Sequence, residues 1–406
     1  MEFGLIGKKL GHSFSPKIHN LLGDYNYTLK EIPEEELKDF FEKKDFLGLN
    51  VTIPYKEKVM EFLSVVDKKA LEIGAVNTVV NKNGVLYGYN TDYFGLKYLL
   101  ESNDISVKGK SVAILGSGGA SKTAFVLLKD LGAKSVITVS RHGKYNYNNQ
   151  KEYSSVDIII NASPVGMYPM SGECLIDLNI FNSLQAVVDL VYNPFVTELM
   201  LLASKRGIKS VNGLSMLVAQ ALKANELFFD KEIDKYIISD IQKSIEKDLL
   251  NIVFVGMPGS GKSTLAKMLA KNLNKEFIDL DIEFERVYKI TPAKCIVDLG
   301  ESEFREKESA LLTETLKRSG LVIATGGGAV LREENRKAIK ANGKCFYIKR
   351  SICNLPKDNR PLSKDENALT EMFEKRHPLY LEVANFVVEN DGDISETIEK
   401  INEIIG

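Results

Sequence analysis

The sequence predicts an α/β protein with parallel sheets, and three observations support that prediction. Short β-rich runs at residues 111–115, 135–139, 157–160 and 186–190 alternate with longer helical patterns. The same alternation restarts at Asn251. A glycine-rich turn follows a predicted strand and precedes a predicted helix in each half of the chain. Together these features are typical of strand and helix units that stack into parallel sheets.

Length and composition favour an enzyme of small-molecule metabolism with more than one domain. A chain of 406 residues exceeds what one core usually organises, so two or three domains are expected. The net charge of −2 leaves no basic excess for nucleic acid or an anionic membrane. Residues 1–7 do not resemble a signal peptide, no segment has the length of a membrane span, and the four cysteines form no CxxC pair. We therefore expect a cytoplasmic protein with reduced thiols.

A phosphate-binding loop follows the predicted strand at residues 251–255. Residues 256–264 are GMPGSGKST, which contain the GxxxxGKS pattern, and a helical stretch continues to residue 273. Backbone N–H groups of such a loop point at phosphate oxygens, and the helix N-terminus adds positive charge. We expect Lys262 to reach the β and γ phosphates and Ser263 to bind Mg²⁺. The predicted ATP-binding residues of this loop are Gly259, Ser260, Gly261, Lys262, Ser263 and Thr264.

Several charged and glycine-rich positions follow this loop. Asp279 and Asp281 end the next predicted strand, and alternate strand residues share a face, so we expect both carboxylates to point the same way. Such a pair is as often a helix cap, because a helical pattern follows Asp281. Each downstream arginine, taken alone, is most simply a solvated surface charge.

Taken in order, these positions match a family. Residues 251–406 resemble shikimate kinase, through the phosphate loop, Asp-x-Asp, Phe-Arg, Gly-Gly-Gly, Arg-Pro-Leu and Arg-x-Pro-Leu-Tyr. The 351–359 stretch is shorter than the lid usual in that family. The resemblance implies Asp279 on the Mg²⁺ side, Asp281 as the catalytic acceptor from shikimate hydroxyls, Arg305 and Arg376 on the shikimate carboxylate, Gly327 and Gly328 as backbone donors, and Arg360 on the phosphates.

The first glycine-rich turn indicates a dinucleotide site. Residues 116–121 are GSGGAS between a strand and a helix, although Ser121 replaces the third glycine, so a generic turn is an equal alternative. Arg141, after the next strand, favours the 2′-phosphate of NADP over the ribose hydroxyls of NAD. The predicted NADP-binding residues are Gly116, Gly118, Gly119, Ala120, Ser140, Arg141 and Gly213.

Hydroxyl, amide, Lys and Asp groups gather around turns in the rest of the N-terminal half. The segments GHSFSP (11–16), NVTIPYK (50–56), GAVNT (74–78) and GYNTD (88–92) lie before the turn, and NASPVGM (161–167), DLVYNP (189–194) and NGLSMLVAQ (212–220) lie after it. Helix caps would explain several members, including Asp92, and Lys56 alone would be a solvated residue.

In combination these segments resemble shikimate dehydrogenase, from residue 1 to about 227. The resemblance implies Lys56 and Asp92 at the reacting carbon, which agrees with the chemistry, because ketone reduction needs a proton donor beside the developing alkoxide. Binding of the shikimate carboxylate and hydroxyls is implied for Ser13, Ser15, Thr52, Asn77, Tyr192 and Gln220.

The expected domain order follows from these assignments. A substrate-binding domain at residues 1–100 is completed by a helix at about 214–229, and an abbreviated Rossmann-like NADP domain occupies 101–213. The abbreviation lies between Arg141 and Asn161, where the family usually carries another helix and strand. Isoleucines recur every fourth residue from Ile233 to Ile245, so 230–250 is an expected helical linker. The kinase domain occupies 251–406.

The leading hypothesis is a bifunctional enzyme of aromatic amino-acid biosynthesis. It would reduce 3-dehydroshikimate with NADPH and then phosphorylate shikimate with ATP and Mg²⁺. Two alternatives stay open: a quinate-type dehydrogenase, and an N-terminal half that regulates the kinase without catalysis. NADP versus NAD preference, channelling, regulation and oligomeric state also stay open, a homodimer being one possibility.

Overall fold

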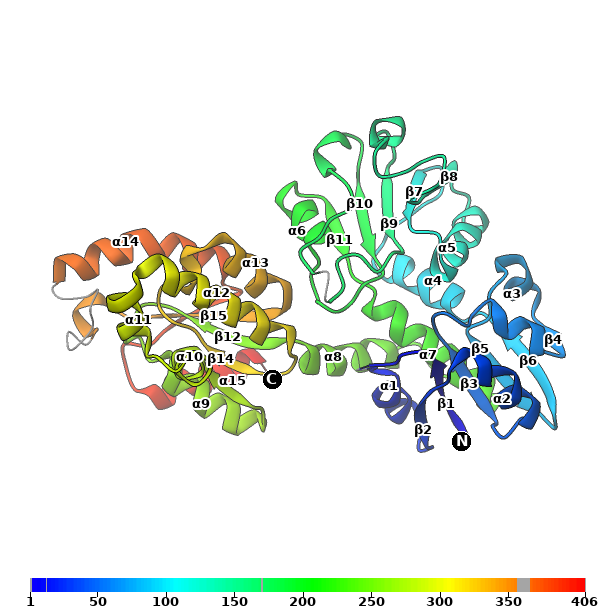
Figure 1. Ribbon diagram of the computed structural model, residues 1–406, viewed down its shortest axis with the longest axis horizontal. Helices are drawn as coiled ribbons and strands as arrows, with labels where there is room; N and C mark the ends of the chain where they lie inside the picture. Colours follow the sequence, from blue (N-terminus) through cyan, green and yellow to red (C-terminus); the bar gives the residue numbers. More distant parts are fainter. Residues whose placement is uncertain (1, 12, 169–170, 356–365, 406) are drawn as a thin grey trace. The chain divides into compact units, whose positions relative to one another are not determined.

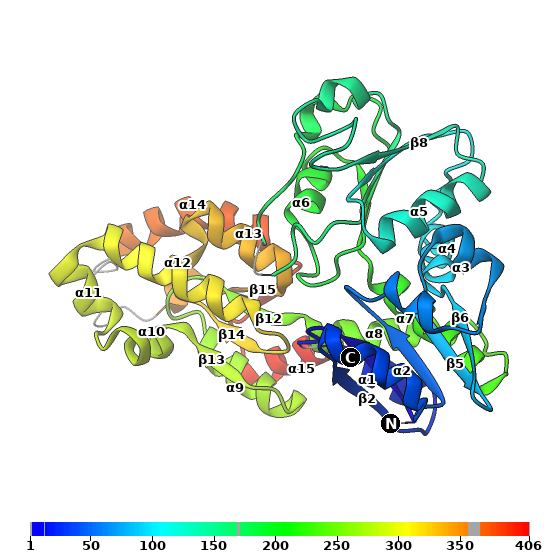
Figure 2. The same cartoon turned by 45° about the vertical axis from the view of Figure 1, so that its right-hand side comes forward.

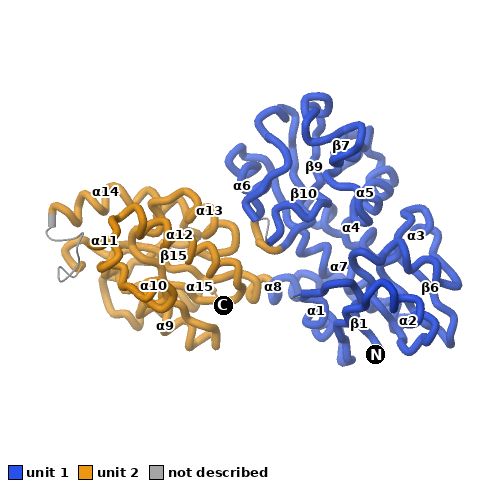
Figure 3. The backbone as a smooth tube through the Cα atoms, in the orientation of Figure 1, with its two compact units in different colours: residues 1–192, 197–245 blue, residues 193–196, 246–406 orange. Residues whose placement is uncertain are grey.

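The computed structural model describes residues 2–11, 13–168, 171–355 and 366–405, which form two compact units (Figure 3). Unit 1 comprises residues Met1–Tyr192 and Thr197–Ile245, and unit 2 comprises Asn193–Val196 and Glu246–Gly406. Among the described residues, no helix combines the length and apolar character needed to cross a membrane. Both units are α/β, as the sequence predicted.

The first sheet of unit 1 is mixed and six-stranded (Figure 1). Its order is β2-β1-β3-β5-β6-β4, with β5 antiparallel to both β3 and β6. The strands are β1 Phe3–Gly7, β2 Tyr27–Glu31, β3 Gly48–Val51, β4 Val65–Val66, β5 Thr78–Lys82 and β6 Val85–Tyr89. The helices and 3-10 turns that accompany it are α1 Ser15–Leu22, η1 Glu34–Glu36, α2 Leu37–Lys43, η2 Lys58–Phe62 and α3 Lys68–Ile73.

The second sheet of unit 1 is parallel and five-stranded. Its order is β11-β10-β9-β7-β8, which places β7 at the point where the chain reverses its direction across the sheet, the usual location of a ligand crevice. Between β8 and β9 the chain forms only the 3-10 turn η3. The elements are β7 Ser111–Leu115, α5 Gly119–Asp130, β8 Ser135–Val139, η3 Gln150–Tyr153, β9 Ile158–Asn161, η4 Leu178–Ile180, β10 Ala186–Asp189, α6 Glu198–Lys205 and β11 Lys209–Val211.

Two helices join the sheets of unit 1. Helix α4 (Asp92–Ser102) packs closely against α7 (Leu214–Phe229), and side chains of both enter one core with β7, β9 and β10. The contact depends on Gly95, because a Cβ there would lie 2.7 Å from the Met216 carbonyl oxygen. The close approach fixes the start of α4 relative to the middle of α7.

The predicted linker helix is shorter than expected. Helix α8 spans Ile237–Leu249, so Ile233 lies outside it. The chain leaves α7 at Asp230 in a left-handed conformation, and the Ile233 amide donates to the Glu226 side chain. These interactions separate α7 from α8 where isoleucine spacing alone suggested a continuous pattern. The division between the units falls within α8.

Unit 2 has one parallel sheet with the order β13-β14-β12-β15-β16 (Figures 1 and 2). One core cluster contains side chains of α9 and α15, and another contains side chains of α10, α12, α13 and α14. The elements are β12 Asn251–Val255, α9 Lys262–Leu273, β13 Phe277–Asp279, α10 Leu280–Tyr288, α11 Pro292–Leu299, α12 Glu301–Lys317, β14 Val322–Ala324, η5 Ala329–Leu331, α13 Glu333–Asn342, β15 Gly343–Lys349, η6 Ile352–Asn354, α14 Glu366–Val383, β16 Phe386–Glu389 and α15 Ile394–Ile405.

A buried carboxylate organises the turn after β10. Asp189 is fully buried and accepts hydrogen bonds from the Asn161 amide at 2.9 Å, the Val191 N–H at 3.1 Å and the Thr197 hydroxyl at 2.6 Å. Burial raises the pKa of Asp189 to about 6, although these three donors oppose the rise. The carboxylate therefore holds the ends of β9, β10 and the start of α6 together.

We predict that Asp189→Asn raises the stability of unit 1 more at high pH than at low pH. The folded pKa lies above the ordinary value of 3.8, so the Asp189 contribution is fully present below pH 3.8 and is lost as the pH rises through about 6. Urea unfolding followed by circular dichroism should show a stabilisation roughly 1 kcal/mol larger at pH 8 than at pH 5. An equal change at both pH values would contradict this assignment.

Candidate active sites

A buried ion pair forms the centre of the candidate site in unit 1. Lys56 follows β3, Asp92 begins α4, and Lys56 Nζ lies 2.6 Å from Asp92 Oδ2. The side chains are only 18% and 9% exposed. Asp92 is therefore not a cap, and Thr91 occupies the N-cap position of α4. A positive donor held by a fixed carboxylate suits proton transfer to a substrate oxygen.

Amide side chains lie beside this pair. Asn77 precedes β5, and its Oδ1 accepts from the Thr91 N–H at 2.7 Å. Gln220 on α7 lies 3.4 Å from the Thr91 hydroxyl through its Oε1. Thr91 thus contacts two predicted substrate-binding residues, Asn77 and Gln220. The predicted residues Lys56, Asp92, Asn77 and Gln220 come together around the start of this helix.

A second group of predicted residues surrounds Phe14. Ser13 Oγ lies 3.1 Å from Ser15 Oγ and also accepts from the Ser15 N–H, while the Tyr192 ring packs edge-on against Phe14. Burial raises the pKa of the Tyr192 phenol, so this group stays neutral. Thr52 follows β3 and packs over Gly7.

The glycine-rich turn lies at the end of β7 and next to Lys56. Gly116 has φ +111°, and a Cβ there would lie 3.0 Å from the Ala162 carbonyl oxygen. Ser121, which replaces the third glycine, donates its hydroxyl to the Gly116 carbonyl at 2.8 Å and so closes the turn. A Cβ on Gly119 would lie 3.5 Å from Lys56 Cδ. The turn therefore adjoins the ion pair.

The remaining predicted cofactor residues flank this turn. Gly118 is the N-cap of α5, so no side chain caps the helix, and Ala120 lies in its first turn. A helix N-terminus of this kind favours an anion. Arg141 is exposed directly after β8, the strand beside β7, and the Ser140 amide donates to the Tyr145 carbonyl. Gly213 precedes α7, where a Cβ would lie 2.2 Å from the Leu190 carbonyl oxygen.

The phosphate loop of unit 2 connects β12 to α9. The Lys262 ammonium lies across the loop, 3.0 Å from the Gly256 carbonyl and 2.9 Å from the Met257 carbonyl. Ser263 and Thr264 are exposed in the first turn of α9. Gly261 has φ +96°, and a Cβ there would lie 2.4 Å from Asn390 Nδ2.

Asn390 supports this loop and was not predicted. It follows β16, is buried, and donates to the Ser260 carbonyl at 2.8 Å. The Thr397 hydroxyl donates to Asn390 Oδ1 at 2.9 Å. The contact spans 130 residues, so no local pattern in the sequence indicated it.

The geometric prediction for Asp279 and Asp281 is wrong. Strand β13 ends at Asp279 and α10 begins at Leu280, so Asp281 lies on the helix and does not share a strand face with Asp279. Asp279 is the N-cap and accepts from the Asp281 N–H at 3.0 Å. Capping was one of the two expected explanations, but with Asp279 as the cap.

The two predicted arginines differ in their surroundings. Arg305 on α12 pairs with Glu308 at 2.7 Å and Glu301 at 3.1 Å. Arg376 on α14 is 6% exposed and makes no ion pair among the described residues. Burial lowers the pKa of Arg376, the interaction with Tyr380 opposes the shift, and the Arg305 charge adds to it. A buried guanidinium beside a second one favours a bound anion.

Glycines bring the arginines and the phosphate loop together. A Cβ on Gly328 would lie 2.3 Å from Arg305 Nη2, and one on Gly327 would lie 2.7 Å from Pro258 Cδ. The Tyr380 hydroxyl donates to the Gly327 carbonyl. The Gly326–Gly328 turn therefore touches the phosphate loop on one side and the guanidinium of Arg305 on the other.

Glu308 is a site residue that sequence reasoning missed. It is buried, and a Cβ on Gly326 would lie 2.7 Å from Glu308 Oε1 and 3.2 Å from Asp281 Oδ1. Burial raises its pKa, the Asp281 charge adds to the rise, and Arg305 opposes it. The spacing of three between Arg305 and Glu308 on a helix was the available signal.

Arg360 lies outside the described residues, so its predicted role stays a prediction.

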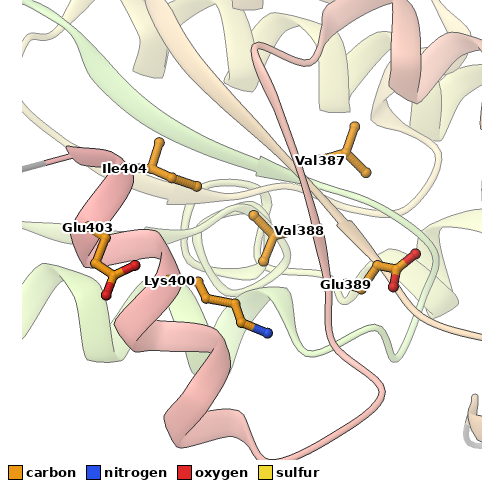
Figure 4. Close-up of a pocket in the computed structure, with 6 residues that line it drawn as sticks. All are labelled: Val387, Val388, Glu389, Lys400, Glu403 and Ile404. Carbon is orange, nitrogen blue, oxygen red and sulfur yellow. The ribbon is translucent and has the colours of Figure 1, made fainter.

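A shallow pocket elsewhere in unit 2 contains none of the predicted residues (Figure 4). It lies between β16 and α15 and is lined by Val387, Val388, Glu389, Lys400, Glu403 and Ile404. Its mixed charges converge on no common point.

Comparisons with known proteins assign each unit to a family. The family model for shikimate kinase matches residues 258–405, and the model for the shikimate dehydrogenase substrate binding domain matches residues 5–79. The NADP-dependent shikimate dehydrogenase of Clostridium perfringens is 37% identical over 265 residues, which cover 60% of this chain and 98% of that enzyme. The enzyme of Clostridium beijerinckii is 38% identical over 268 residues, with coverage of 61% and 99%.

Solved structures agree with these relatives. A chorismate mutase/shikimate 5-dehydrogenase fusion protein from Clostridium acetobutylicum is 40% identical, with a TM-score of 0.57 and coverage of 60% of this chain and 96% of that one. A shikimate dehydrogenase solved with NADP+ is 31% identical, with a TM-score of 0.55 and coverage of 60% and 94%. The Listeria monocytogenes enzyme, solved with shikimate and NAD, is 30% identical, with a TM-score of 0.54 and coverage of 59% and 96%. The chain therefore belongs to the shikimate dehydrogenase family in its N-terminal region and carries a shikimate kinase domain at residues 258–405, which joins two enzymes of the shikimate pathway.

Proposed function

We propose that unit 1 reduces 3-dehydroshikimate to shikimate with Lys56 and Asp92 as its catalytic residues. The observation that carries this proposal is the 2.6 Å ion pair beside the glycine-rich turn. NADPH, when bound, supplies the hydride. Lys56 donates a proton to the oxygen of the reduced carbonyl, and Asp92 keeps the ammonium in position.

The other predicted residues orient the substrate. Ser13 and Ser15 form a pair of hydroxyls for the carboxylate, and the neutral Tyr192 packs on Phe14 beside them. Asn77 and Gln220 present amide groups for ring hydroxyls next to Asp92. Thr52 contributes a hydroxyl from the end of β3.

The residues of the glycine-rich turn fit a dinucleotide. Gly116 permits the close approach of β7 and β9, and the N-terminus of α5 faces outward without a side-chain cap. The exposed Arg141 provides a guanidinium for a 2′-phosphate, which supports NADP over NAD. Gly118, Gly119 and Ala120 would supply backbone donors for the pyrophosphate.

For unit 2 we assign shikimate to the surface formed by Arg376, Arg305 and the Gly326–Gly328 turn. The buried Arg376 provides positive charge for the carboxylate, and Arg305 is oriented by its two carboxylate partners. Asp281 accepts from a substrate hydroxyl. Gly327 packs on Pro258, and this contact brings the acceptor to the phosphate loop.

Lys262 and the N-terminus of α9 stabilise the transferring phosphoryl group. Lys262 now lies against two loop carbonyls, and we expect it to turn to the β and γ phosphates of ATP. Ser263 and Asp279 would hold Mg²⁺, which would neutralise charge on the ATP phosphates. One Asp279 oxygen caps α10, which leaves the other for this ion.

Lys56→Ala in the full chain should lower kcat for 3-dehydroshikimate reduction about 10²- to 10⁴-fold, because the proton donor is lost. Following NADPH oxidation by absorbance measures the effect. Lys58→Ala is the matched control, since the Lys58 side chain is half-buried, 40% exposed, and pairs with Glu34. Phosphorylation of shikimate should not change, and a parallel loss of kinase activity would favour a regulatory role for unit 1. Turnover of quinate in place of shikimate would identify the alternative substrate.

Lys262→Ala should reduce shikimate phosphorylation by about 10³-fold or more, because the variant lacks the positive charge that Lys262 places beside the phosphates. ADP release in a coupled assay reports this step. Lys267→Ala, on the exposed side of the same helix, is the control. Substantial kinase activity in Lys262→Ala would refute the assigned role, and reduction of 3-dehydroshikimate should stay at the wild-type rate.

Arg141→Ala should raise the KM for NADPH about tenfold or more and leave the KM for NADH nearly unchanged, because only NADPH carries the 2′-phosphate. Initial rates at saturating 3-dehydroshikimate give both values. Lys151→Ala provides a control for loss of an exposed positive charge in the same connection. Equal increases for both cofactors would show that Arg141 does not recognise this phosphate.

A further inference from the structure

A chain of buried hydroxyl and amide groups lies behind the candidate site of unit 1. Asn50 on β3 faces Thr78 on β5 across the antiparallel pair, and Thr78 faces Thr91 at the start of α4. Their exposed fractions are 5%, 0% and 2%. Buried polar groups are retained only where their hydrogen bonds are satisfied, so the direction of each bond can be followed.

The direction is set at Asn50. Its Nδ2 lies 3.4 Å from the Asn77 backbone carbonyl, which can only accept, and its Oδ1 accepts from the Tyr27 hydroxyl at 2.8 Å. The amide nitrogen therefore also donates to Thr78 Oγ1, at 3.1 Å. The hydroxyl proton of Thr78 must then point away from Asn50.

The hydroxyls of Thr78 and Thr91 lie between Asn50 and the amide side chains of Asn77 and Gln220. Thr78 Oγ1 lies 3.0 Å from Thr91 Oγ1 and 3.2 Å from Asn77 Oδ1. Thr91 Oγ1 lies 3.2 Å from Asn77 Oδ1 and 3.4 Å from Gln220 Oε1. Within the part of the chain that the structure describes, the acceptors near these protons are the neighbouring hydroxyl and the two amide oxygens.

Backbone groups support the same orientation. The Thr91 N–H donates to Asn77 Oδ1 at 2.7 Å, and Gln220 Nε2 donates to the Leu217 carbonyl at 2.9 Å. Asn77 Nδ2 makes no hydrogen bond within the described part of the chain. Thr91 is the N-cap of α4, yet its hydroxyl makes no capping bond. The Thr91 hydroxyl is therefore available to donate to the amide oxygens of Asn77 and Gln220.

We propose that Thr78 and Thr91 are positioning residues for the reduction. Their hydroxyls hold the oxygens of Asn77 and Gln220 toward the interior, which leaves N–H donors for the ring oxygens of the substrate. A ligand in this part of the site is thus recognised through oxygens that accept hydrogen bonds. The inference rests on the proposed reduction of 3-dehydroshikimate.

The test compares valine and serine variants of the full chain. Thr78→Val/Thr91→Val keeps the shape of both side chains and removes both hydroxyls, which takes an acceptor away from the buried Asn50 Nδ2 and therefore lowers stability. Thr78→Ser/Thr91→Ser keeps the hydroxyls and removes two methyl groups. Thr28→Val on β2 is the control, since Thr28 is half-buried and makes no side-chain hydrogen bond among the described residues.

We expect the double valine variant to raise the KM for 3-dehydroshikimate about tenfold, the loss typical of a misplaced hydrogen-bond donor. The KM for NADPH should stay near the wild-type value, whereas the melting temperature should fall because Asn50 Nδ2 loses an acceptor. The double serine variant should recover the wild-type KM within about threefold. The two hydroxyls act as one unit. The free-energy change that corresponds to the rise in KM for 3-dehydroshikimate should therefore be smaller in the double valine variant than the sum for the two single valine variants.

Two results would overturn the inference while the proposed reduction stands. One is a wild-type KM in the double valine variant, and the other is a serine variant as impaired as the valine variant, which would indicate packing instead of hydrogen bonding. If the double valine variant does not fold, the single Thr91→Val and Thr91→Ser variants decide the question by the same comparison. A wild-type chain that does not reduce 3-dehydroshikimate would instead refute the proposed function.

Discussion

The close packing of α4 on α7 is the contact on which the dehydrogenase unit depends. Asp92 begins α4 and Gln220 lies on α7, so the distance between the helices sets the distance between these two side chains. Gly95 allows the approach, because any side chain there would collide with the Met216 carbonyl. The same helices contribute to the core beneath the parallel sheet of unit 1. One packed pair of helices thereby positions Asp92, its partner Lys56 and Gln220 relative to that sheet.

The kinase unit solves a comparable problem with short loops at the ends of parallel strands. The phosphate loop follows β12, and the Gly326–Gly328 turn follows β14, the neighbouring strand. Loops at the same edge of a parallel sheet meet naturally, and small residues let them touch. Gly327 packs on Pro258, while Gly328 lies under the guanidinium of Arg305. The two loops are adjacent because the strands are adjacent.

Buried charges in both units are held by specific partners. Lys56 pairs with Asp92, and Arg305 pairs with Glu301 and Glu308. Arg376 is buried too but makes no ion pair among the described residues; burial lowers its pKa, and Tyr380 and the Glu301 charge oppose that shift. Burial of a cation without an ion-pair partner is costly, and a bound anion would relieve that cost.

The sequence by itself determined the fold class, four of the five strands of the parallel sheet of unit 1, the phosphate loop and the identity of both families, because these depend on local periodicity and on short ordered motifs. It did not determine that Asp281 lies on a helix, that α8 begins at Ile237, or that Asn390 supports the phosphate loop. Those outcomes depend on capping and on contacts between distant segments. The hydrogen bonds that link Asn50, Thr78 and Thr91 to the amide of Gln220 were likewise decided only by the tertiary structure. These groups lie far apart in the sequence and meet only after the strands and helices have packed together.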